Sequence, residues 1–129
     1  MIRCIRIWTG KDNNSHFEEG VIDLNLKNNR GDSLSSKFMA QTVSFQETPP
    51  GGKFEWHNDP VRQIVVTLAG NLDFVTRNND HFKINPGDIL LAEDSTGSGH
   101  SWTLTGPDPW RRVYVVLAPD APVSFIANK

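Results

Sequence analysis

The sequence predicts an all-β protein, a sandwich or barrel of short strands with little or no helix. Apolar residues recur with a period of two along most of the 129-residue chain, which is the spacing of half-buried strands. Gly, Pro, Asn and Asp interrupt these runs at intervals of roughly 8–12 residues, as is typical of sandwiches and barrels. No repeat, linker or amphipathic helix divides the chain. We therefore expect one domain over residues 1–129.

The expected strands are short and separated by clear turns. The best turn signal is Asn85-Pro86-Gly87-Asp88, in which proline presets one backbone dihedral and glycine accepts a positive one. A polar loop is expected over residues 27–36. The strands are expected at residues 5–8, 21–26, 37–47, 54–57, 62–69, 72–77, 81–84, 89–92, 101–104 and 112–117.

Composition argues against several classes of partner. The formal net charge is −2 and the isoelectric point about 6.0, so no basic surface is expected for nucleic acid or anionic membrane. No apolar run approaches the length of a membrane helix, and the alternating N-terminus is unlike a signal peptide. Cys4 is the single cysteine, which rules out an intrachain disulfide and favours a reducing, cytoplasmic location.

Two polar side chains with useful chemistry share a face in one extended segment. His57 and Asp59 are two residues apart, so in a strand both point to the same side. An imidazole beside a carboxylate can chelate a metal ion or act as an acid/base pair. The pair alone leaves both functions open.

The spacing around His57 resembles the first motif of the cupin family. That motif runs glycine, five residues, His-x-His, three or four residues, Glu, six residues, glycine. Gly51, His57, Asp59, Gln63 and Gly70 reproduce every interval. Asp59 stands at the position of the second histidine, and Gln63 at that of the glutamate.

A second stretch is similar to the other cupin motif. Gly87 matches its first glycine, and His100 matches its histidine two residues later than the pattern expects. Glu93 replaces the proline and Leu104 the asparagine. The resemblance covers about residues 38–117 and implies a double-stranded β-helix, also called a jelly roll or cupin barrel.

Carried over by position, the cupin resemblance implies a pocket where His57, Asp59, Gln63 and His100 converge. The implied metal is a divalent ion such as Fe, Mn, Ni or Zn, and the implied catalytic residues are His57, Asp59 and His100. Three functions stay open: a metal-dependent oxygenase, isomerase or lyase acting on a small polar substrate; a metal-free acid/base enzyme; and a non-catalytic small-molecule-binding protein with a degenerate metal site.

Four further residues are candidates for substrate binding. Arg62 can clamp a carboxylate, Trp56 and Trp102 can line an apolar pocket, and Glu93 opens a Gly-rich loop that can fold over it. Each has a structural alternative, such as a surface ion pair or a place in the core. Either Glu93 or Asp94 can act as a general base if the loop folds over the pocket, but a cap or solvated position is favoured for both. One of Arg111 and Arg112 can point inward as an anion ligand, but a surface role is favoured for them. Core or pocket-wall positions are expected for Phe45, Phe54, Phe74 and Tyr114.

The resemblance also implies a homodimer, because small cupins commonly pair through an N-terminal strand. Residues 2–8 are the natural edge or exchanged strand of this chain.

Overall fold

The computed structural model describes residues 1–128, which form strands and turns and contain no helix. No helical segment in that range therefore has the length and hydropathy needed to cross a lipid bilayer. The strands are β1 (Arg3–Thr9), β2 (Ser15–Ile22), β3 (Leu26–Lys27), β4 (Ser33–Leu34), β5 (Ala40–Thr48), β6 (Lys53–His57), β7 (Gln63–Ala69), β8 (Asn71–Thr76), β9 (His81–Ile84), β10 (Ile89–Glu93), β11 (His100–Thr105), β12 (Trp110–Leu117) and β13 (Phe125–Ala127).

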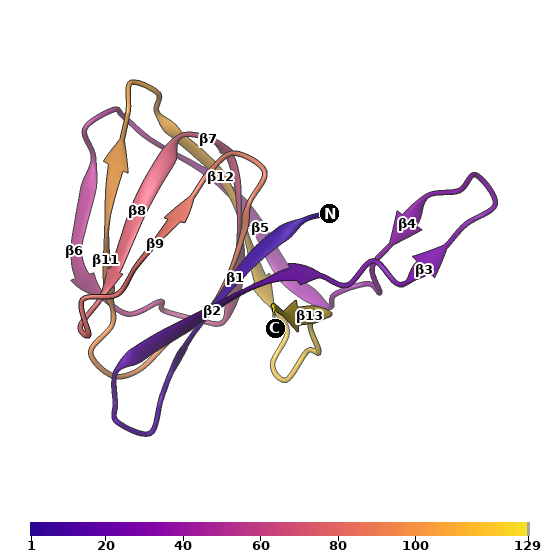
Figure 1. Ribbon diagram of the computed structural model, residues 1–129, viewed down its shortest axis with the longest axis horizontal. Coiled ribbons are helices and arrows are strands. Elements are labelled where there is room, and N and C mark those ends of the chain that lie inside the picture. The colour runs from indigo at the N-terminus through magenta and orange to yellow at the C-terminus, as the bar shows by residue number, and fades with distance from the viewer. Residues whose placement is uncertain (129) are drawn as a thin grey trace.

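Two sheets face each other and enclose the barrel interior (Figure 1). The larger sheet has the order β13-β2-β1-β10-β7-β12-β5, and the smaller has the order β6-β11-β8-β9. Neighbours in space are mostly distant in sequence, as in a chain that winds back and forth between two sheets. This arrangement is the double-stranded β-helix of the cupin type, so the predicted fold class is confirmed. The short β3–β4 hairpin projects away from the barrel (Figure 1).

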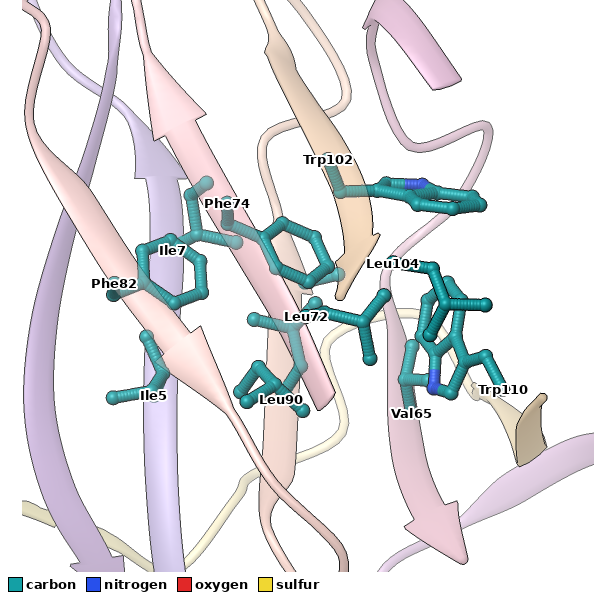
Figure 2. Close-up of a cluster of buried hydrophobic side chains, with 12 residues drawn as sticks. Ile5, Ile7, Val65, Leu72, Phe74, Phe82, Leu90, Trp102, Leu104 and Trp110 are labelled. Atoms are coloured by element: carbon teal, nitrogen blue, oxygen red, sulfur yellow. The ribbon is translucent and has the colours of Figure 1, made fainter. Parts of the chain in front are cut away.

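Alternation along the strands fills the barrel with apolar side chains (Figure 2). Leu72 and Phe74 of β8 point inward beside Phe82 of β9, while the residues between them face outward. The rings of Phe74 and Phe82 stack with centroids 4.9 Å apart. Trp102 and Trp110 meet edge to face at 4.8 Å. Cross-strand contacts of this kind specify the register, because a one-residue slip would expose them.

The larger sheet is apolar on both faces. Leu90 and Ala92 of β10 point into the barrel, whereas Leu91 packs on the outside under the segment that follows β12. That outer cluster also contains Ile64 and Ala121. Burial on two sides explains why residues 89–92 form a continuous apolar run rather than an alternating one.

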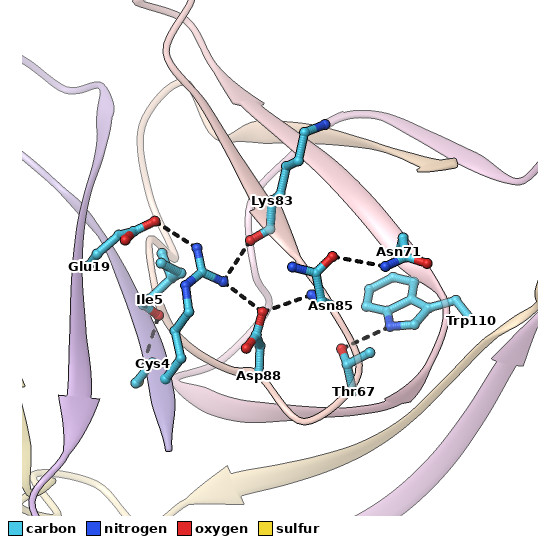
Figure 3. Close-up of polar contacts among 10 residues, drawn as sticks. Cys4, Ile5, Glu19, Thr67, Asn71, Lys83, Asn85, Asp88 and Trp110 are labelled. Atoms are coloured by element: carbon cyan, nitrogen blue, oxygen red, sulfur yellow. Dashed lines mark hydrogen bonds and ion pairs between the residues drawn. The ribbon is translucent and has the colours of Figure 1, made fainter. Parts of the chain in front are cut away.

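The N-terminal strand corrects one expectation. β1 lies inside the sheet, parallel to β10 on one side and antiparallel to β2 on the other, so it is not an edge strand. Its charged residues have partners within the chain: Arg3 bonds Glu19 and Asp88, each at 2.6 Å, and both acceptors are labelled in Figure 3. Asp88 also accepts a 2.8 Å bond from the Asn85 amide, which ties β1 to the predicted turn. The homodimer itself stays a prediction.

Three elements differ from the sequence expectation. β2 begins at Ser15, well before the expected start at residue 21, and ends at Ile22. Its first residues are polar, and they pair with β1 from Ser15 onward. The expected loop over residues 27–36 holds the β3–β4 hairpin. β13, which was not expected, pairs with β2 at the end of the larger sheet.

Candidate functional site

A cavity of about 530 Å³ lies between the two sheets, within the usual range for small-molecule sites. Side chains from β5, β6, β7, β11, β12 and the loop between β6 and β7 line it. They are Ser44, Gln46, Thr48, Lys53, Phe54, His57, Asp59, Pro60, Gln63, Trp102, Arg112, Tyr114 and Val116.

Three of the predicted site residues converge at this cavity. His57 ends β6, Asp59 lies in the loop that follows, and His100 begins β11. One donor atom from each lies within 4.8 Å of the others. The two imidazole rings meet edge to face with centroids 4.5 Å apart. Asp59 is buried and lines the cavity, so its carboxyl points inward, as a ligand at this position requires.

Two local irregularities bring the histidines together. Gly99 has a φ of 73°, and a Cβ atom there would overlap the His57 carbonyl oxygen, so only glycine allows this close approach. Between Phe54 and His57, β6 also has one more residue than the facing part of β11, which is a β-bulge. The bulge places both side chains on the same face, and their rings stack at 4.0 Å.

Hydrogen bonds orient both imidazoles in the same way. His57 Nδ1 donates to the Glu55 carbonyl at 2.7 Å, and His100 Nδ1 donates to Asp94 Oδ2 at 2.6 Å. Each Nε2 therefore stays available to a ligand, and His100 Nε2 lies 4.0 Å from Asp59 Oδ1. Burial lowers the pKa of His57, and the nearby His100 adds to this effect. His57 is thus neutral at pH 7, as a metal ligand must be.

The site contains a buried pair of carboxyl groups. Burial raises the pKa of Asp59 to about 9, and contact with Asp94 adds to it. Burial would also raise the pKa of Asp94, but hydrogen bonds with His100, Asp59 and Ser15 outweigh this effect and lower it. Asp59 Oδ2 and Asp94 Oδ1 have no donor among residues 1–128. In the absence of a bound cation, one proton shared between the two groups would serve both oxygens.

The donor set suits a divalent metal ion. Two imidazole nitrogens and one carboxylate oxygen are the ligands of non-haem iron sites that keep positions open, and imidazole also suits Zn, Ni and Cu. Asp59 Oδ2 is buried without a donor, which a cation would remedy. The Asp94–His100 bond matches the carboxylate that commonly orients a ligating histidine from behind. His57, Asp59 and His100 can therefore hold a metal ion.

The remaining predicted residues divide into two groups. Gln63 is buried beside Asp59, and Trp102 lies two residues beyond His100; both line the cavity. Arg62 and Glu93 do not line it; they pair with each other at 2.6 Å and line a different hollow with Arg6.

The fourth predicted substrate-binding residue, Trp56, also lies outside the cavity. Its ring covers the guanidinium of Arg77 at 3.9 Å. The bulge in β6 turns it away from the face that His57 occupies.

Sequence reasoning missed two members of the site. Asp94 was assigned to a cap or solvated position but is fully buried against His100. Arg112 was expected at the surface but is 2% exposed and lines the cavity. Phe45, expected in the core or pocket wall, is instead 75% exposed on the outside of the larger sheet. Arg112 and Phe45 share a cause, because mainly polar residues of β5 and β12 face the cavity.

Comparisons with known proteins add two solved structures. No protein-family model matches the chain, and no curated protein matches it. An uncharacterized conserved protein with a double-stranded β-helix domain from Klebsiella pneumoniae subsp. pneumoniae MGH 78578 is 22% identical, with 85% of each chain covered and a TM-score of 0.49. A conserved protein of unknown function from Streptococcus pyogenes is 13% identical, with 69% of this chain and 72% of that chain covered and a TM-score of 0.45.

Proposed function

We propose that this protein is a metal-dependent enzyme that acts on a small polar molecule in the barrel cavity. The ligands are His57 Nε2, His100 Nε2 and the carboxylate of Asp59. The observation that carries the proposal is that both histidines use Nδ1 to bond an acceptor, which leaves both Nε2 atoms free within reach of one buried carboxylate. The oxygenase, isomerase and lyase classes all fit such a site.

Each neighbouring residue has a defined task in this proposal. A bound divalent ion would act as a Lewis acid on a substrate oxygen or activate water. Asp94 orients His100, and Ser15 holds Asp94 in place with a 2.6 Å bond. Gln63 contacts the Asp59 carboxyl. Trp102 and Phe54 supply apolar walls to the cavity.

A metal-free acid/base enzyme is a second candidate, and one observation favours it. The raised pKa of Asp59 keeps that carboxyl protonated at neutral pH, beside an imidazole that is already oriented by Asp94. Such a carboxylic acid can donate a proton to a substrate. A non-catalytic binding protein is the third candidate, and a bound molecule that co-purifies and leaves unchanged would support it.

Metal titration tests the proposal. The chelator-treated chain is titrated with Fe(II), Mn(II), Ni(II) and Zn(II), and we expect about one equivalent of at least one ion to bind. Asp94→Asn should weaken binding by about 10- to 100-fold, because it removes the carboxylate that orients His100. The matched control is Asp73→Asn, which alters a similar pair at the surface, where Asp73 lies 3.0 Å from His81. It should leave metal affinity unchanged.

Two outcomes would overturn the metal proposal. One is binding of less than about a tenth of an equivalent of every ion by the folded chain. The other is an equal effect of Asp94→Asn and Asp73→Asn, because the metal would then lie away from His100. In the first case, Asp59→Asn and His100→Ala should still weaken a metal-free reaction if the acid/base candidate holds.

A further inference from the structure

The cavity contains a second charged feature apart from the histidine and carboxylate group. Arg112 of β12 points into the barrel and is 2% exposed. It makes no ion pair with a carboxylate of residues 1–128. Arginine stays protonated in proteins, so the cavity wall holds a buried and uncompensated positive charge.

Neutral groups hold the Arg112 guanidinium in a fixed orientation. Nη1 donates to Thr48 Oγ1 at 2.8 Å and to the Trp110 carbonyl at 3.2 Å, and Nε donates to the Tyr114 hydroxyl at 3.1 Å. One face lies on the Trp110 ring, 3.6 Å from its centroid. Nη2 makes no hydrogen bond within the described chain. A rigid, oriented donor is therefore left over on a cavity-lining side chain.

The other arginines show how unusual this position is. Four of them meet a carboxylate at 2.6 Å although all are more exposed than Arg112: Arg3 with Glu19, Arg6 with Glu93, Arg62 with Glu93, and Arg111 with Glu47. Burying a cation without a counter-charge is costly, and stacking on Trp110 offsets only part of that cost. If Arg112 had a structural role alone, a neutral side chain would be favoured at this position. A negatively charged ligand would offset the cost of burying the Arg112 cation.

We propose that Arg112 is an anion subsite and that it binds the carboxylate group of a small organic acid in this cavity. The inference rests on the proposed use of the cavity as a ligand site, but not on a bound metal. One unpaired positive charge matches a singly charged carboxylate. A phosphate dianion would leave one of its two negative charges unmatched by Arg112. The remainder of the acid would lie between Arg112 and the His57–Asp59–His100 group, against Trp102.

Titration with benzoate and benzamide tests the subsite, because the two probes share shape and differ in charge. Calorimetry on the chelator-treated chain should show benzoate binding at least about tenfold more tightly, as expected for a charge-assisted hydrogen bond. Arg112→Gln should abolish this preference. Arg111→Gln makes the same change one residue away, where the side chain is 57% exposed and pairs with Glu47, and it should preserve the preference.

A wild-type measurement covers the case in which Arg112→Gln does not fold. The buried Nε–H of Arg112 should give a slowly exchanging NMR signal that moves with benzoate and not with benzamide. Equal affinity for the two probes, a preference that survives Arg112→Gln, or an unmoved signal would overturn the subsite. So would benzoate binding only to metal-loaded protein without dependence on Arg112, since the carboxylate would then be on the metal. If the chain binds no metal but still prefers benzoate to benzamide through Arg112, the metal proposal fails and the anion subsite stands.

Discussion

The two ends of the barrel interior are built from the same strands, but one end buries apolar side chains and the other buries polar ones. At one end, Leu72, Phe74 and Ile84 are fully buried and apolar. At the other, His100 and Asp94 are equally buried and carry polar groups. β11 connects the ends directly, because its inward residues run from Leu104 through Trp102 to His100 in steps of two.

The difference shows where this chain gains stability and where it gives stability up. The apolar end removes hydrocarbon from water, at roughly 25 cal/mol per Å². The polar end buries Asp59, Asp94 and His100, each of which costs free energy unless it is bonded or paired. Some polar atoms there still lack partners. Unsatisfied buried groups at one end of an otherwise well-packed barrel are consistent with the proposal that a ligand binds there.

Truncating the apolar end should have the largest effect on stability. Phe74→Ala removes a ring that stacks on Phe82 and meets Trp110 edge to face. We expect the free energy of unfolding to fall by about 3–5 kcal/mol, as for other buried aromatic side chains. Urea denaturation followed by tryptophan fluorescence measures it. Phe45→Ala, at a position 75% exposed, is the matched control and should change stability by no more than about 0.5 kcal/mol. Similar losses in both variants would contradict the contrast between the two ends.

Raising the pH should destabilise the polar end of the metal-free protein. The folded-state pKa of Asp59 is raised to about 9, so the folded chain retains a proton that the unfolded chain loses near its ordinary carboxyl pKa of about 4. Stability therefore falls as pH rises through that window. His57 acts oppositely, because its lowered pKa makes stability rise until it is neutral in both states, above about pH 7. Asp94 has a lowered pKa, so it changes the pH dependence of stability only at acidic pH.

The effect of Asp59 on stability can therefore be measured by itself from about pH 7 to about pH 9. There the slope should approach about −1.4 kcal/mol per pH unit in wild type. Asp59→Asn should flatten it, and urea denaturation at several pH values with chelator present provides the measurement. Asp73→Asn, at a partly exposed carboxylate, should keep the wild-type slope. A slope that is the same in wild type and Asp59→Asn would mean that no proton is retained on Asp59.

The sequence predicted the apolar end and the centre of the polar end for different reasons. In β8 and β9 only one face is buried, so alternation alone identifies Leu72, Phe74 and Phe82 as core residues. Cupin spacing, rather than alternation, indicated that His57, Asp59 and His100 converge. That convergence depends on contacts between residues far apart in the chain, which a local pattern does not contain.

Alternation did not predict the wall of the cavity. In β12 it separates Val113 and Val115 from Arg112 and Tyr114, but it does not say which pair faces inward. Tyr114 was expected in the core or pocket wall, and alternation puts Arg112 on the same face as Tyr114. The surface position expected for Arg112 did not apply that pattern, and both side chains line the cavity. Arg62 and Glu93 adopt the structural alternative to substrate binding, an ion pair. Both lie on the outer face of the larger sheet, and their pairing depends on the contact of β7 with β10.

The smallest expected effect marks the boundary of the polar end in β6. Phe54 and Trp56 are two residues apart, yet the bulge before His57 leaves only Phe54 in the cavity wall. Phe54→Ala should weaken benzoate binding severalfold, since a ring contact contributes about 0.5–1.5 kcal/mol. Trp56→Ala should leave that affinity unchanged and lower stability by no more than about 1 kcal/mol, because it removes a cation–π contact with Arg77 at the surface. Calorimetric titration of the two variants with benzoate shows which of the two side chains faces the cavity. A larger loss of affinity in Trp56→Ala would mean that β6 follows strict alternation and that the bulge is wrongly placed.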